Sequence, residues 1–181
     1  QALGGRIALA STPGGGTTAT ISLPLTLAVL EGMLVEVAGE TLVVPSMALR
    51  ETMRASDAAI HRLGSGGPVL RMRGELIPTT DLGTLLGYRS VPDSFDDHSL
   101  MLVESFAGQK VALTVDRILG QREVVIKGLA ENYGQVPGVA AATILGDGRI
   151  ALIIDIDQVA RGDLSGAEPR PALRAAATGG N

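Results

Sequence analysis

The chain has 181 residues and a formal net charge of −4, with 45% hydrophobic but only 2% aromatic residues. This composition can supply an aliphatic core for one ordinary domain or two small ones. The acidic balance, without a basic stripe, disfavours a nucleic-acid partner. The absence of cysteine excludes disulfides, thiolate metal sites and a cysteine nucleophile.

The most apolar region, residues 21–37, is interrupted by a proline, a glycine and two glutamates. That leaves no run long enough to cross a membrane, and no signal-peptide layout is present. We therefore predict no direct membrane insertion. The first residue is Gln1 rather than Met, as in a piece cut from a longer protein.

Residues 3–11 and 19–24 read as two strands joined by a glycine-rich turn. Apolar and polar residues alternate in the second strand, which predicts one buried face. A hairpin of this size is not stable alone in water. It must pair with the rest of this chain or with a domain that is missing from it.

The next stretch predicts a second hairpin. Residues 25–34 are compatible with a helix or a strand, because a short apolar run does not distinguish them. Residues 33–37 and 41–44 then pair around Gly39-Glu40, and Pro45 closes the hairpin. Residues 48–54 predict a helical turn, and residues 58–63 lead as a strand into a glycine-rich turn at 64–67.

A third hairpin is predicted from residues 69–72 and 75–78 around Arg73-Gly74. A short helix at 81–86 follows, with Asp81 as its cap and Gly87 as its stop. Residues 90–98 predict an exposed polar loop. Residues 100–105 and 110–115 pair as strands across a glycine turn, residues 123–126 form another strand, and residues 128–138 are irregular.

The last hairpin, residues 138–155, organises the chain. Apolar runs at 140–145 and 150–154 flank a Gly-Asp-Gly-Arg turn, a strong hairpin signal. Both runs are nearly continuous in apolar residues, so we expect them in an interior. A short helix then starts near Asp155 or Asp157, with a carboxylate capping its free N–H groups.

Two patterns recur along the chain. Val-Ala-Leu-Thr-Val-Asp at 111–116 resembles Ile-Ala-Leu-Ile-Ile-Asp at 150–155, and a Gly-Glu turn followed by a strand and a proline occurs at 39–45 and 74–78. Many short strands with helices at the connections are typical of small β-barrels. The sequence therefore predicts a mainly β fold of two small barrels.

Candidate chemistry is sparse. The Gly-Gly-Gly-Thr-Thr segment at 14–18 could cradle a phosphate, but no Gly-Lys-Ser/Thr follows, and a plain turn is the favoured interpretation. Asp116, Asp155 and Asp157 could form an acidic pair for acid–base work or a hard metal, but each follows an apolar strand, where helix capping is commoner. No catalytic residue and no metal ligand is assigned.

The two histidines give no clearer site. His98 lies beside Asp93, Asp96 and Asp97, but their spacing matches no metal motif and a solvated loop is favoured. His61 is conceivable as a phosphoacceptor, but an exposed structural histidine is favoured. Neither belongs to a recognisable catalytic triad.

Four motifs follow one another in unbroken order within residues 3–160. They are Gly-Gly-Gly-Thr-Thr with Ile-Ser-Leu-Pro-Leu-Thr-Leu-Ala at 14–28, the hairpin ending at Pro45, Val-Asp at 115–116 with Leu-Gly-Gln-Arg-Glu-Val-Val-Ile-Lys at 119–127, and Ala-Thr-Ile-Leu-Gly-Asp-Gly-Arg at 142–149. Together they resemble a CheA-type chemotaxis histidine kinase.

This resemblance implies a division of the chain. Residues 1–29 resemble the terminal strands of the kinase's ATP-binding domain and a linker. Residues 30–160 resemble the CheW-like regulatory domain, built from two SH3-like five-stranded β-barrels with short helices. Residues 161–181 are predicted to be a disordered tail or linker, since Ala, Gly, Pro and Arg bury little apolar surface.

The resemblance also implies a regulatory role without catalysis. Such a domain docks a CheW-type adaptor and, with it, links the kinase to chemoreceptor cytoplasmic tips in membrane-associated arrays. The full-length kinase would be a cytoplasmic homodimer using ATP and magnesium. This fragment would hold no cofactor, apart from a nucleotide-site remnant at Gly16, Thr17 and Thr18.

Two alternatives stay open: a free-standing CheW-like adaptor, and, less favoured, a nucleotide-binding ATPase fragment. The Gly-Thr-Thr segment favours the kinase, because an adaptor has no use for the end of an ATPase. One departure from the kinase pattern is Gly128, where the family usually has proline. The absence of that proline loosens the loop that leads into the last segment.

Overall fold

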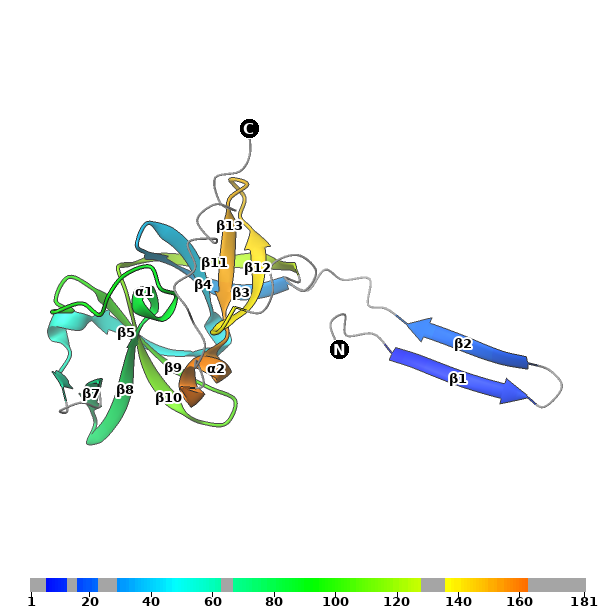
Figure 1. The fold of residues 1–181 in the computed structure, drawn as a ribbon, viewed down its shortest axis with the longest axis horizontal. Coiled ribbons are helices and arrows are strands. Elements are labelled where there is room, and N and C mark those ends of the chain that lie inside the picture. The colour runs from blue at the N-terminus through cyan, green and yellow to red at the C-terminus, as the bar shows by residue number, and fades with distance from the viewer. Residues whose placement is uncertain (1–5, 13–15, 23–28, 63–66, 128–135, 163–181) are drawn as a thin grey trace.

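The computed structural model describes residues 6–12, 16–22, 29–62, 67–127 and 136–162. Strands dominate these residues, with short helices at connections (Figure 1). The elements are β1 Arg6–Thr12, β2 Gly16–Ser22, β3 Val29–Val37, β4 Glu40–Pro45, η1 Ser46–Ala48, β5 Leu49–Arg54, η2 Ala55–Asp57, β6 Ile60–Arg62, β7 Pro68–Met72, β8 Glu75–Asp81, α1 Leu82–Leu85, β9 Ser99–Glu104, β10 Lys110–Val115, β11 Arg117–Lys127, β12 Val139–Ile144, β13 Ile150–Ile154 and α2 Ile156–Arg161.

Two β-subdomains share one strand order. The closed barrel has the order β11-β12-β13-β4-β3, and the second subdomain has the order β5-β9-β10-β8-β7, with β6 added at its edge. In each, one pair is parallel, β13 with β4 and β10 with β8. The predicted mainly β fold is therefore confirmed. The second subdomain differs from the expected five-stranded barrel in being a six-stranded sheet.

The recurring sequence patterns correspond to equivalent strands in the two subdomains. The β3–β4 turn has positive φ at Ala38 (52°) and Gly39 (84°), and the β7–β8 turn has the same form at Arg73 (50°) and Gly74 (85°). Consecutive positive φ angles are typical of tight hairpin turns whose twist matches that of the strands. The predicted hairpins around both turns are confirmed.

Three apolar clusters stabilise the fold. One fills the closed barrel, around Val43 and Ile153, and another fills the second subdomain, around Leu70 and Leu100. The third contains residues of both subdomains and both helices, among them Val35, Leu82, Met101, Leu113, Ile154 and Val159. The two subdomains are therefore packed together as one body through aliphatic side chains.

Three sequence predictions need correction or completion. Residues 48–54 are not a helical turn, since η1 passes into β5, whose side chains alternate between half-buried and exposed because the strand pairs with β9. The undecided segment at 25–34 is strand from Val29 onward. The loop at 90–98 is polar, but it buries Phe95 in the second subdomain's core.

The final hairpin is confirmed. The predicted burial of both strands holds for β13 and only in part for β12. β13 is buried from Ala151 to Ile154, because it is paired on both edges within the closed barrel. β12 alternates instead, and Ala140 and Ile144 are exposed. The short helix predicted after it is α2, which Asp155 caps through the Gln158 N–H at 3.0 Å.

The N-terminal hairpin is also confirmed, and its strands pair from Arg6–Ser22 to Thr12–Gly16. It forms a separate two-stranded sheet, drawn apart from the two subdomains in Figure 1. Ala19, expected on a buried face, is exposed. The predictions for 128–135, including Gly128, and for the tail from 163 onward lie outside the described residues.

Candidate interaction site

The predicted nucleotide-site remnant lies at the start of β2. Gly16 has a φ of 87°, and the Thr17 hydroxyl lies 3.1 Å from the Ser11 hydroxyl across the hairpin. Gly16 and Thr17 are exposed. Thr18 lies on the same strand, while residues 13–15 of the glycine turn are outside the described residues. The nucleotide role of these residues stays a prediction.

The three candidate aspartates have three separate roles. Asp155 caps α2, as predicted. Asp157 accepts the backbone N–H of Phe106 at 2.9 Å, in the turn between β9 and β10. Asp116 is not a helix cap: its Oδ2 accepts the N–H of Ala38 at 2.6 Å, and its Oδ1 accepts from Arg89. The predicted capping role of Asp116 is therefore wrong, because no helix follows β10.

The loop carboxylates Asp93, Asp96 and Asp97 are exposed, and His98 is half-buried beside them. Among the described residues, no three histidine, aspartate or glutamate side chains are grouped as a metal site. His61, the conceivable phosphoacceptor, is exposed on the edge strand β6. The exposed positions of the three carboxylates and of His61 agree with the solvated interpretation. His98 does not, because its side chain is only 15% exposed and its ring packs edge-on against Phe95.

A network of charged side chains instead occupies the crossover between the subdomains. Arg89, which follows α1, donates to Asp81 through Nε at 3.0 Å and Nη2 at 2.7 Å, and to Asp116 through Nη1. Asp81 also accepts from the Thr84 N–H and from the Thr114 hydroxyl. We call Asp81, Arg89 and Asp116 the crossover clamp.

The clamp's electrostatics favour its charged state. Burial raises the pKa of the Asp81 carboxyl, but hydrogen bonds from Arg89 and Thr84 outweigh burial and hold that pKa below its ordinary value. Asp81 and Asp116 raise the pKa of Arg89 above its ordinary value. The Asp81 side chain is only 3% exposed, so its charge depends on these partners.

The clamp joins the two subdomains at the point where the chain passes between them. Asp116 lies between β10 of the second subdomain and β11 of the closed barrel. Its backbone N–H donates to the Glu36 carbonyl at 3.0 Å, and its side chain reaches the β3–β4 turn. Because the hydrogen bonds of the clamp are made within the chain, we interpret the clamp as a structural feature.

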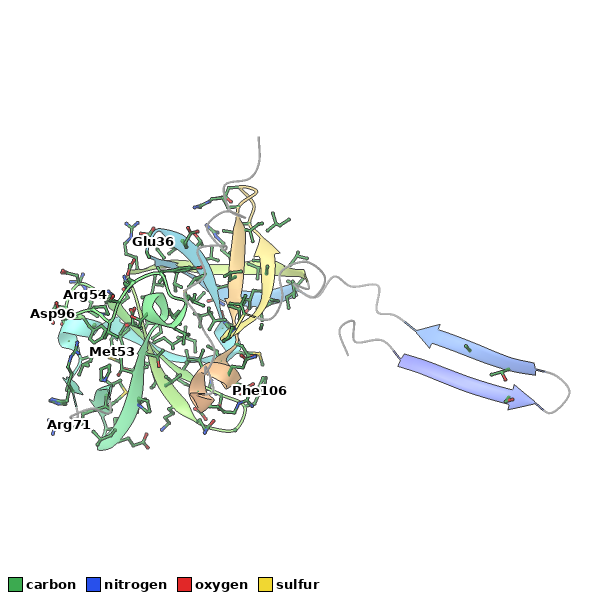
Figure 2. The ribbon with its side chains drawn as sticks, in the orientation of Figure 1. Glu36, Met53, Arg54, Arg71, Asp96 and Phe106 are labelled. Atoms are coloured by element: carbon green, nitrogen blue, oxygen red, sulfur yellow. The ribbon has the colours of Figure 1, made fainter. Side chains whose placement is uncertain are left out.

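An apolar groove also lies between the subdomains, and it is open. Its volume is about 600 Å³ and its lining includes Pro45 and Met47, Ile126, Ile153 and Ile156, with Phe106 from the β9–β10 turn. Phe106 is 84% exposed and Met47 is 61% exposed. Figure 2 shows Phe106 beside α2. Exposed apolar side chains around a hollow are a feature that interaction surfaces share.

Polar contacts of Arg50 hold the backbone at Met47 beside the groove. Arg50 donates to the Met47 carbonyl at 3.1 Å and to Glu104 of β9 at 3.0 Å. A second hollow of about 590 Å³ also includes Met47 and Arg50 in its lining. Met47 therefore lies where two hollows meet, and Arg50 ties its turn to the second subdomain.

A smaller apolar patch lies at one end of the closed barrel. Ile144 of β12 and Ile150 of β13 are directly opposite each other in the hairpin register, and both are exposed. We call this pair the strand-end patch. It belongs to the hairpin that the sequence singled out, but the alternation that exposes Ile144 was hidden by a continuous apolar run.

Sequence reasoning missed the crossover clamp and the groove. Asp81 and Asp116 were noticed as caps, whereas Arg89 carried no signal, because the sequence does not show that the fold brings it between the ends of β8 and β10. For Phe106 a signal was present: an aromatic residue beside a glycine turn, in a chain with only 2 phenylalanines.

Within the described part of the chain, no helix is long and apolar enough to span a membrane.

The match to a family model defines the class of this protein. Residues 31–163 match the model of the CheW-like domain family, and the chain belongs to that family. A solved structure, the scaffolding protein TtCheW from Thermoanaerobacter tengcongensis, aligns with a TM-score of 0.61 at 19% identity, covering 78% of this chain and 95% of that one. This likeness supports the fold.

Curated relatives place the chain among chemotaxis proteins. It is 58% identical over 154 residues to the chemotaxis protein CheA of Cereibacter sphaeroides, covering 85% of this chain and 22% of that protein. It is 49% identical over 179 residues to the CheA of Rhizobium meliloti, covering 99% and 24%. The chain therefore spans less than a quarter of the length of these relatives.

Proposed function

We propose that the chain is the regulatory portion of a chemotaxis histidine kinase, which binds a CheW-type adaptor and couples the kinase to chemoreceptors. The observation that carries the proposal is the extent of the similarity. The CheW-like family covers residues 31–163, whereas similarity to a CheA relative extends over 99% of the chain. The matched N-terminal residues include the β1–β2 hairpin, which an adaptor does not need.

The strand-end patch supports adaptor docking. Ile144 and Ile150 offer exposed β-branched side chains at the end of a closed barrel. An adaptor of the same fold carries barrel ends too, so the two proteins meet barrel to barrel over an interface of modest area. Charged substitution at such an interface lowers affinity strongly, because the partner would bury an unpaired charge.

The apolar groove supports binding of a chemoreceptor cytoplasmic tip. A hollow of about 600 Å³ with an apolar lining suits the apolar face of a helix. Phe106 and Met47 are residue types that interfaces favour. The adaptor and the receptor therefore occupy different surfaces, which allows both to bind one domain.

The test is a pair of calorimetric titrations on the 181-residue chain. We expect the purified adaptor to bind the wild-type chain and to bind Ile144→Lys at least tenfold more weakly, while Phe106→Ala keeps wild-type affinity for the adaptor. A receptor cytoplasmic fragment should show the opposite preference. No adaptor binding at high micromolar concentration would contradict the proposal.

A free-standing adaptor is the second candidate, favoured by the 95% coverage of the scaffolding protein TtCheW. Sequencing upstream of Gln1 separates the two: a start codon immediately before it supports the adaptor, and a reading frame that continues upstream supports the kinase.

We propose that the fragment is not catalytic. Titration with ATP and magnesium should then give no heat, and a micromolar dissociation constant would support the ATPase alternative.

A further inference from the structure

Phe106 is presented to solvent by an ordered turn. Among the exposed large hydrophobic residues in the described part of the chain, it has the highest exposure, 84%. Aromatic side chains dominate interface energetics when a partner buries them. Their contribution is reduced when a flexible loop has to be ordered on binding. An ordered turn therefore favours higher affinity for a partner that binds in the groove.

The turn is hydrogen-bonded within itself. The Ser105 N–H donates to the Gln109 carbonyl at 2.9 Å, and the Gly108 N–H donates to the Ser105 carbonyl at 3.0 Å. The Gln109 N–H also donates to the Ser105 hydroxyl at 3.1 Å. The Phe106 N–H has its acceptor outside the turn, at Asp157 Oδ1, 2.9 Å away.

Asp157 ties this turn to a different element. It lies in the first turn of α2, and that helix is capped by its neighbour Asp155 rather than by Asp157. The hydrogen bond from Phe106 to Asp157 spans 51 residues of sequence and connects the second subdomain to the helix that follows the closed barrel. Both residues line the apolar groove.

We propose that Asp157 is a positioning residue: its carboxylate holds the Phe106 backbone so that the ring is pre-organised as the aromatic anchor for an apolar helix in the groove. The inference rests on the proposed function, since it concerns the same groove. It assigns Asp157 a role in partner affinity although Asp157 need not touch the partner's apolar face.

A double-mutant cycle tests this role, with a receptor cytoplasmic fragment as the probe and calorimetry as the measurement. We expect Phe106→Ala to weaken binding at least tenfold and Asp157→Ala to weaken it about fivefold. Asp157→Asn, which keeps the side-chain acceptor, should stay within about twofold of wild type. Phe106→Ala with Asp157→Ala should bind no more weakly than Phe106→Ala alone, because the tether acts only through Phe106.

Asp96→Ala is the matched control, since Asp96 is an exposed aspartate far from Phe106 (Figure 2). It should bind as wild type does. Wild-type affinity in Asp157→Ala would overturn the positioning role, and so would fully additive losses in the double variant. Either result would leave the groove assignment intact, because Phe106→Ala tests the groove separately.

Hydrogen exchange of the Phe106 amide in the unbound chain provides a readout that needs no partner. We expect exchange at least tenfold faster in Asp157→Ala and unchanged in Asp157→Asn. Unchanged exchange in Asp157→Ala would overturn the tether itself. If the wild-type chain binds no receptor fragment, the groove assignment fails and the positioning role fails with it, whatever the exchange rates.

Discussion

The crossover clamp and the apolar groove both lie where the two subdomains meet, and they differ in how their side chains are satisfied. In the clamp, Arg89 is hydrogen-bonded to Asp81 and Asp116, and Asp81 also accepts three hydrogen bonds from Thr84 and Thr114. In the groove, Phe106 and Met47 stay exposed. A charged cluster with internal partners stabilises the chain, whereas unpartnered apolar surface is available to another protein.

The difference shows that charge alone is a poor guide to function in this molecule. Asp116, Asp155 and Asp157, which stood out in the sequence, make hydrogen bonds within the chain, and the side chains that fit a partner are apolar. Changes in the clamp should alter folding, and changes in the groove should alter binding.

Replacing Arg89 tests the clamp with the largest expected effect. In Arg89→Met the volume is retained, but the nearly buried Asp81 carboxylate loses its charged partner. We expect the free energy of unfolding to fall by about 3 kcal/mol, measured by urea denaturation. The control is Arg73→Met, because the Arg73–Glu51 pair is exposed and should contribute less than about 0.5 kcal/mol. Equal losses of unfolding free energy in the two variants would contradict the distinction between the nearly buried clamp and an exposed ion pair.

Gly83→Ala tests the packing of the same clamp. An added Cβ would lie 2.6 Å from Arg89 Nε and 3.0 Å from its Cγ, so the side chain must shift. We expect a loss of about 1–2 kcal/mol in thermal or urea unfolding. The control Gly146→Ala places its Cβ in open space, where nothing lies within 4 Å. A Gly83→Ala chain as stable as the Gly146→Ala chain would show that Arg89 is not held in place.

Acid should weaken the clamp through Asp81. Its folded-state pKa lies below the ordinary value of about 3.9, so the carboxylate stabilises the fold above that value and the stabilisation is lost as pH falls through the folded-state pKa. We expect the urea midpoint of the wild-type chain to decrease as the pH is lowered below about 4. In Asp81→Asn this drop should be shallower, and an identical pH dependence in both chains would contradict the role of Asp81.

Phe106→Ala should have the smallest effect on stability. The ring is exposed, so its removal leaves no cavity, and we expect a change within about 0.5 kcal/mol. The same variant should lose receptor-fragment affinity, which separates the groove from the clamp. A loss of more than about 2 kcal/mol, roughly the effect of removing a core side chain, would show that Phe106 is part of the core.

Sequence reasoning predicted the local features of the fold well. The Gly39 and Gly74 turns and the Asp81 and Asp155 caps were found because their signals lie within a few residues. The strand β5 was missed, because its alternation becomes meaningful only when it pairs with the distant β9. For the same reason Arg89 was not recognised, since its partners are brought together by the fold.

The most direct test is amide chemical-shift mapping of the 15N-labelled chain during titration with a CheW-type adaptor and, separately, with a receptor cytoplasmic fragment. We expect the adaptor to shift the amides around Ile144 and Ile150, the receptor fragment to shift those around Phe106, and the amide of Arg89 to change least. Largest changes at Arg89, or no changes at high micromolar concentration of either partner, would contradict this expectation.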